Sequence, residues 1–144
     1  MSTLTQRVLN TRAGYGLTVL RILVGIIFAA HGAQKLFGLF GGYGLAGTAQ
    51  WMESIGLAPG HLMALLAGGT EFFGGLALII GLLARPAALG LTFTLVVAIL
   101  SVHLHNGLFM SNNGYEFALA LLGGTLAVLI EGAGKASVDG IINR

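Results

Sequence analysis

The chain has 144 residues, of which 56% are hydrophobic and only 8% are charged. Soluble domains carry about 25% charged residues, so this composition excludes a globular domain with a hydrated surface. Seven basic and five acidic residues give a net charge of +2, which is too small an excess to indicate a nucleic-acid partner. We therefore expect residues 1–144 to form one integral membrane domain.

Taken in order, the chain predicts an all-α, four-helix membrane bundle. Residues 1–14 are polar and lack the apolar core and cleavage site of a signal peptide, so the first apolar run is expected to be retained. A short interfacial helix is predicted at residues 48–55, in a segment rich in glycine and aromatic residues, and a tight turn at Arg85–Pro86. The predicted spans, each long enough for about 30 Å of hydrocarbon, are residues 17–37, 61–83, 87–105 and 115–130.

The positions of the basic residues predict the orientation of the bundle. The first and third connections between spans contain no lysine or arginine. Basic residues are typical of cytoplasmic segments, so both termini are predicted to be cytoplasmic and both long loops to face outward. The basic residues that carry this prediction are Arg7, Arg12, Arg85, Lys135 and Arg144.

The first predicted span contains three basic side chains. At about 100° per residue, Arg21, His31 and Lys35 lie within a sector of about 80° on one face of the helix. A charge within hydrocarbon costs several kcal/mol, so such residues normally face the bundle interior and indicate a functional site. For Lys35, the alternative is that the side chain extends to the outer interface.

The other spans add polar groups to the same middle or outer half of the bundle. Glu71 lies near the middle of the second span and is expected to pair with Arg21 or His31, or to stay protonated. His103 is expected to face inward and His105 to lie at the rim. These positions predict a polar pocket in the outer half. Haem ligation by His31 and His103, or a metal site made by His31, His103 and Glu71, remain alternatives.

Three segments of the sequence resemble the DoxX family of small bacterial four-helix membrane proteins. They are RILVGIIFAAHGAQKLFG, TEFFGGLALIIGLLARPAA and HLHNGLFMSNNGYEFALALLGG, followed by the family-like end GAGKASVD. The resemblance covers roughly residues 15–140. It implies a location in the bacterial inner membrane and recurrent polar residues at Arg21, His31, Lys35, Glu71, His103, Asn106 and Glu116.

The resemblance also suggests a redox role. The family takes its name from a membrane subunit of a thiosulfate:quinone oxidoreductase, and some relatives are linked to membrane complexes for oxidative-stress defence with superoxide dismutase and a sulfurtransferase. We therefore expect a quinone-like amphiphile in the outer-half pocket, with His31 and Glu71 in catalytic roles. The ligand-binding residues are expected to be Arg21, Lys35, His103, Asn106 and Glu116.

Two other functions fit the same residues. The first alternative is a non-enzymatic membrane scaffold that recruits redox partners. The second is a small transporter or lipid-handling protein, in which a homo-oligomer would form the pathway. The chain has no cysteine, so sulfur or electron chemistry would need a partner protein or a bound cofactor. Whether the chain turns over a substrate is left open at this point.

Overall fold

The computed structural model describes residues 14–143, and every regular element in that part of the chain is a helix. Arg7, Arg12 and Arg144, on which the predicted orientation partly depends, lie outside the described residues. The α-helices are α2 (Tyr15–Phe37), α3 (Gly44–Ser54), α4 (Gly60–Ile80), α5 (Ala84–Ala98), α6 (Glu116–Glu131) and α7 (Val138–Ile142). A 3₁₀ turn, η1 (Leu39–Gly41), precedes α3.

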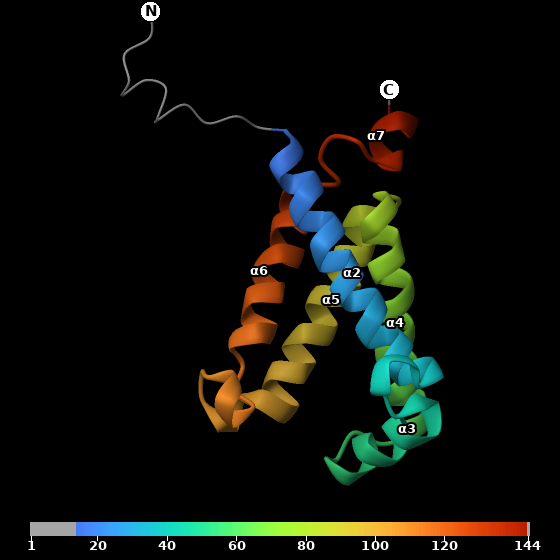
Figure 1. Cartoon of the computed structure of the whole chain (residues 1–144), viewed down its shortest axis with the longest axis vertical. Coiled ribbons are helices and arrows are strands. Elements are labelled where there is room, and N and C mark those ends of the chain that lie inside the picture. The colour runs from blue at the N-terminus through green and yellow to red at the C-terminus, as the bar shows by residue number, and fades with distance from the viewer. Residues whose placement is uncertain (1–13, 144) are drawn as a thin grey trace, which may run out of the picture.

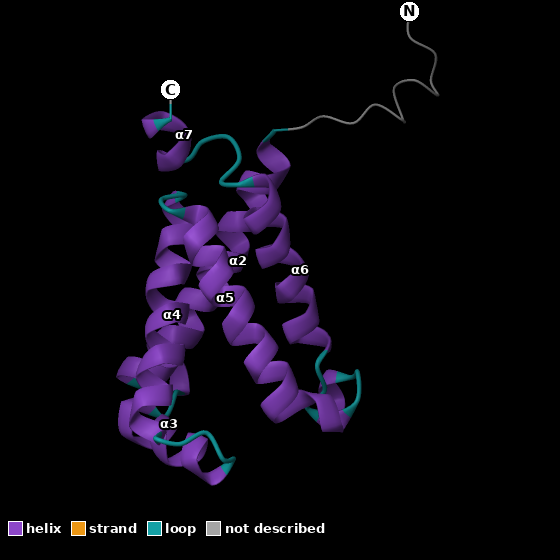
Figure 2. Cartoon of the chain, turned by 180° about the vertical axis from the view of Figure 1, so that it is seen from behind, coloured by secondary structure: helices purple, strands orange, loops and turns teal. Residues whose placement is uncertain are grey.

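The long helices form two arms that meet at one end (Figure 1). One arm contains α2 and α4 with α3 at its tip, and the other contains α5 and α6. The start of α2 and the short helix α7 lie where the arms meet, which we call the terminal end. The arms separate toward α3 and the connection between α5 and α6, which we call the loop end, and the view from behind shows the same separation (Figure 2).

Three helices are long and apolar enough to cross a membrane by length and composition: Tyr15–Phe37, Gly60–Ile80 and the helical stretch Ala84–Asn106. The fourth long helix, α6, has 16 residues and rises about 24 Å, which is shorter than a typical hydrocarbon layer. The described chain is therefore an all-α membrane protein with three candidate spans. A fourth span and the cytoplasmic placement of the termini remain predictions.

The α2–α4 arm is built on close backbone contact. A Cβ atom placed on Gly25 would lie 2.7 Å from the carbonyl oxygen of Gly75, and one on Gly32 would overlap the backbone of Phe72. Small residues at these positions let two membrane helices approach more closely than larger side chains would allow. The contacts also set the antiparallel register, in which residue 25 faces residue 75 and residue 32 faces residue 72.

The turn between α4 and α5 begins earlier than the predicted Arg85–Pro86 turn. Helix α4 ends at Ile80 because Gly81 adopts a left-handed conformation, with φ of 71°, and caps the helix. Helix α5 starts at Ala84, so Arg85 and Pro86 lie in its first turn. Backbone N–H groups in the first turn have no acceptor within the helix, so the N–H that proline lacks is not needed there. The predicted boundaries at residues 83 and 87 were therefore wrong by three residues each.

The other boundaries also differ from the prediction. Helix α3 spans Gly44–Ser54, four residues earlier than the predicted start at residue 48. Helix α5 continues through a π-helical segment, Ile99–His103, and a 3₁₀ turn, Leu104–Asn106. The tail that follows the fourth predicted span contains a short helix that was not predicted, α7. Its N-cap is Ser137, whose hydroxyl oxygen accepts a hydrogen bond from the amide of Gly140.

Candidate functional site

The charged centre of the α2–α4 arm is an ion pair. The ammonium Nζ of Lys35 donates to Oε2 of Glu71 at 2.7 Å, and the two side chains are 23% and 11% exposed. Glu71 lies on the buried stripe of α4 that also contains Gly68 and Gly75, where α2 approaches most closely. The packing of glycines thus brings two opposite charges together within the candidate spans.

Lys35, and not Arg21 or His31, is the partner of Glu71. The predicted pairing was wrong because it ignored the register of the two helices. Gly32 of α2 packs against Phe72, and Lys35 packs against Gly68, so Glu71 lies at the level of residues 32–35. Arg21 lies about 21 Å farther along α2, at the level of the last turn of α4.

Arg21 acts as a structural clamp at the terminal end. Its side chain is 0% exposed, and its guanidinium donates to four backbone carbonyls. Two of the acceptors are the carbonyls of Leu78 and Ile79 in the last turn of α4. Carbonyls in the last turn of a helix have no partner within the helix. Ala133 and Ala136, at 2.8 and 3.1 Å, belong to the segment between α6 and α7. Arg21 therefore has no access to a ligand near Glu71.

Asp139 completes this clamp from the C-terminal side. Its two carboxylate oxygens accept hydrogen bonds from the amides of Leu83 and Ala84 at 2.8 and 2.9 Å, so Asp139 caps the start of α5. The amide of Asp139 donates to the carbonyl of Gly81 at 2.9 Å. Asp139 lies in the segment GAGKASVD and was not among the predicted site residues. The Ser-x-Asp spacing of Ser137 and Asp139 could have indicated a helix start here, because serine is a common N-cap and aspartate is favoured in the first turn.

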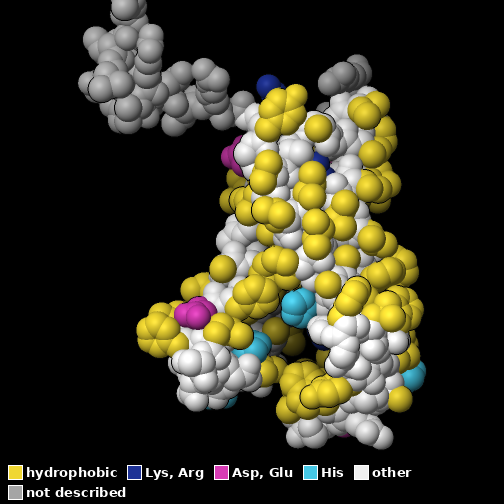
Figure 3. Space-filling model, in the orientation of Figure 1, with side chains coloured by type: hydrophobic (Ala, Val, Ile, Leu, Met, Phe, Trp, Pro, Cys, Tyr) yellow, Lys and Arg dark blue, Asp and Glu magenta, His cyan; other side chains and the backbone are white. Residues whose placement is uncertain are grey.

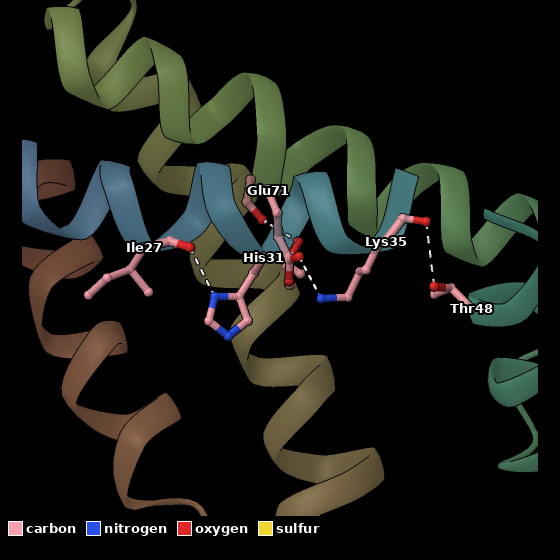
Figure 4. A network of polar contacts seen from close by, with 7 residues as sticks. Ile27, His31, Lys35, Thr48 and Glu71 are labelled. Atoms are coloured by element: carbon pink, nitrogen blue, oxygen red, sulfur yellow. Dashed lines mark hydrogen bonds and ion pairs between the residues drawn. The ribbon is translucent and has the colours of Figure 1, made fainter. Parts of the chain in front are cut away.

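His31 lies one helical turn from Lys35 and is exposed on the face of α2 nearest α6. Its Nδ1 is 2.9 Å from the carbonyl oxygen of Ile27, and its ring centroid is 6.0 Å from that of Phe117 on α6. Because a carbonyl only accepts hydrogen bonds, Nδ1 carries the hydrogen, and Nε2 of the neutral ring is left as an acceptor. Figure 4 shows the His31 ring and the Lys35 ammonium on the same side of α2, with Glu71 between them.

His103 and Asn106 stabilise the connection at the loop end. Nδ1 of His103 is 3.0 Å from the carbonyl oxygen of Asn113, and the amide of Asn106 donates to the same oxygen at 3.1 Å. His103 is half-buried and ends the π-helical segment, a feature frequently found at functional sites. His105, in the following 3₁₀ turn, is exposed.

Glu116 is separate from the ion pair. It is half-buried in the first turn of α6, where a negative charge is favoured by the helix dipole. Among the described residues, no group of three histidine, aspartate or glutamate side chains lies close enough to hold a metal ion. His31, His103 and Glu71 are therefore not brought together as the ligand set considered from the sequence.

The molecule is hollowed between the two arms at the loop end (Figure 3). Hydrophobic side chains are spread over the visible surface of both arms, and histidine side chains lie at the edge of the hollow. Phe117, which faces His31 from the other arm, is 39% exposed. An exposed imidazole on α2, an ion pair between α2 and α4, and an aromatic ring on α6 thus occur where the two arms diverge.

A family model described as DoxX matches residues 16–104. The chain belongs to the DoxX family. Among its relatives is inner membrane protein YqjF of Escherichia coli, which is 38% identical over 132 residues, 90% of this chain and 93% of the relative. Together with three apolar helices, this similarity makes the DoxX-family chain a multi-pass protein of the inner membrane.

Other DoxX-family similarities are weaker or less informative. The Bacillus subtilis protein named Putative oxidoreductase CatD is 34% identical over 113 residues, 78% of each chain. An uncharacterized protein of Haemophilus influenzae is 29% identical over 140 residues, 92% of this chain and 86% of the relative. No solved structure was found to match. The DoxX match contains His31, Lys35 and Glu71 but ends before Asn106 and Glu116.

Proposed function

We propose that this DoxX-family protein binds the head group of a quinone-like amphiphile in the loop-end hollow, as the membrane component of an oxidoreductase system. The observation that carries the proposal is the Lys35–Glu71 ion pair, held inside candidate spans with His31 exposed one turn away. A buried ion pair is weak evidence for stability alone, and ionisable groups within membrane helices typically indicate functional sites. The name of CatD is consistent with redox chemistry in a relative.

The three side chains would have distinct roles toward such a ligand. The Lys35 ammonium, with two hydrogens beyond the one donated to Glu71, would donate to a quinone oxygen and stabilise negative charge on it. His31 Nε2 would accept a hydrogen bond from a quinol hydroxyl. Glu71 would exchange a proton with the ligand by way of the lysine. Reduction of the quinone takes up two electrons and two protons, and the electrons would come from a redox partner.

The direct test is ligand binding by purified protein in lipid nanodiscs. We expect saturable binding of decyl-ubiquinone or a short-chain menaquinone analogue, measured by calorimetry. Glu71→Gln and His31→Ala are each expected to weaken it about tenfold, the effect of losing one hydrogen bond to a charged or buried group. Matched controls are Glu53→Gln on α3 and His61→Ala at the start of α4, which change exposed residues of the same types.

Two outcomes would contradict the proposal. The first is no saturable binding by the wild-type protein, and the second is equal affinity in the wild type and the Glu71→Gln variant. Absence of binding by a stable wild-type protein would favour the scaffold function. In that function the ion pair serves only the packing of α2 against α4, and redox partners associate without a ligand.

A further inference from the structure

A second cavity lies at the terminal end, away from the ion pair. It has a volume of about 740 Å³ and is formed by the start of α5, the end of α6 and α7. This volume is within the range of small-molecule sites, about 300–1,000 Å³. The elements that surround it are held together by the Arg21 and Asp139 hydrogen bonds, so the cavity is part of the folded structure of this end.

Two opposite charges line the cavity without contacting each other. Arg85 donates one hydrogen bond from Nη2 to the carbonyl of Ile130 at 3.1 Å, which leaves most of its guanidinium hydrogens available. Glu131 is exposed, and within residues 14–143 it forms neither an ion pair nor a side-chain hydrogen bond. The carboxylate of Asp139 also lines the cavity, but both of its oxygens cap α5. The groups available to a ligand are therefore one cation and one anion.

The cavity also has an apolar side at the level where the spans end. Leu83 and Ile142 line it and are 62% and 71% exposed, although both are large hydrophobic residues. Leu83 directly precedes the candidate span that begins at Ala84. The ends of membrane helices lie at the depth of the lipid head groups, where apolar and charged groups occur side by side.

We propose that this cavity binds the zwitterionic head group of a phospholipid with the chemistry of phosphatidylethanolamine. The phosphate pairs with the Arg85 guanidinium, the ammonium pairs with Glu131, and the upper part of the acyl chains contacts Leu83 and Ile142. A head group that carries only negative charge would pair with Arg85 but would be repelled by Glu131. The proposal does not depend on quinone binding, because the cavity and the ion pair lie at opposite ends of the arms.

The test is lipid retention by the purified full-length protein, measured by native mass spectrometry after exchange into vesicles of equal phosphatidylethanolamine and phosphatidylglycerol. We expect the wild type to retain phosphatidylethanolamine about tenfold in preference to phosphatidylglycerol, a ratio typical of one charge-assisted contact. Arg85→Gln and Glu131→Gln are each expected to remove the preference. Lys135→Gln is the matched control, because Lys135 lies over the ring of Tyr15 at the same end and does not line the cavity.

A parallel titration with soluble O-phosphoethanolamine distinguishes binding of the lipid from binding of a free head group. Millimolar displacement of the retained lipid by this compound would support the head-group site. Equal retention of both lipids by the wild type would overturn the proposal, as would an unchanged preference in both cavity variants. Binding of O-phosphoethanolamine by protein that retains no lipid would overturn the assignment to a phospholipid.

Discussion

Replacing Arg21 by methionine should destabilise the protein more than any other change to a single basic residue described here. The substitution keeps a long apolar side chain but removes all four hydrogen bonds to backbone carbonyls. Each buried carbonyl that loses its partner costs about 1–3 kcal/mol, and a smaller desolvation cost for methionine offsets part of the sum. We expect a loss of about 3–5 kcal/mol in the free energy of unfolding.

The assay is thermal unfolding in a mild detergent, followed by the fraction of protein that elutes as a single species after heating. The expected loss corresponds to a fall in Tm of about 10 °C for a chain of this size. Arg85→Met is the control, because Arg85 is exposed and its side chain donates one hydrogen bond within residues 14–143. Arg21→Lys should remain well below the wild type, since an ammonium cannot reach four carbonyls in two segments. A Tm for Arg21→Met within 2–3 °C of the wild type would refute the clamp.

The remaining predictions concern helix packing, the ion pair and the α5 cap. Gly75→Ala should cost about 1–3 kcal/mol because its methyl group would overlap the backbone of α2, whereas Gly69→Ala, with open space around it, should be neutral or slightly stabilising in the same unfolding assay. Lys35→Met and Glu71→Gln should each be strongly destabilising, and the double variant should lose less than the sum of the two, by about 1–3 kcal/mol; additive losses would contradict the pairing. Asp139→Ala should lower stability by about 1–2 kcal/mol through loss of the α5 cap, and an unchanged melting curve would contradict that role.

The fold class and most helices could be predicted because a membrane helix requires a long, nearly continuous stretch of apolar residues, which is visible in the sequence. The boundaries around residues 80–87 were missed because two signals compete there. Arg85–Pro86 suggests a turn, but proline is equally suited to the first turn of a helix, and Gly81 with its positive φ decides where α4 ends. The short helix α7 was missed because its apolar side is too small to give a periodic pattern.

The candidate site was predictable in its members but not in its pairings. A helical wheel places Arg21, His31 and Lys35 on one face, yet it contains no information about which residue of α4 lies opposite each of them. That assignment comes from the glycine contacts between α2 and α4. The wheel also could not show that the Arg21 guanidinium donates to four backbone carbonyls, two of which belong to residues more than a hundred positions away.

The sequence separation of the Arg21 contacts has a consequence for the synthesis and membrane insertion of the chain. Ala133 and Ala136 follow Arg21 by 112 and 115 positions, so α2 enters the bilayer long before these acceptors are synthesised. Until then, the guanidinium must rely on water or on the carbonyls of α4. A nascent chain that stops before Gly132 would leave a cation with unmet hydrogen-bond donors in α2. The guanidinium of Arg21 can therefore fill its hydrogen bonds only after residues 133–136 have been synthesised and have packed against α2.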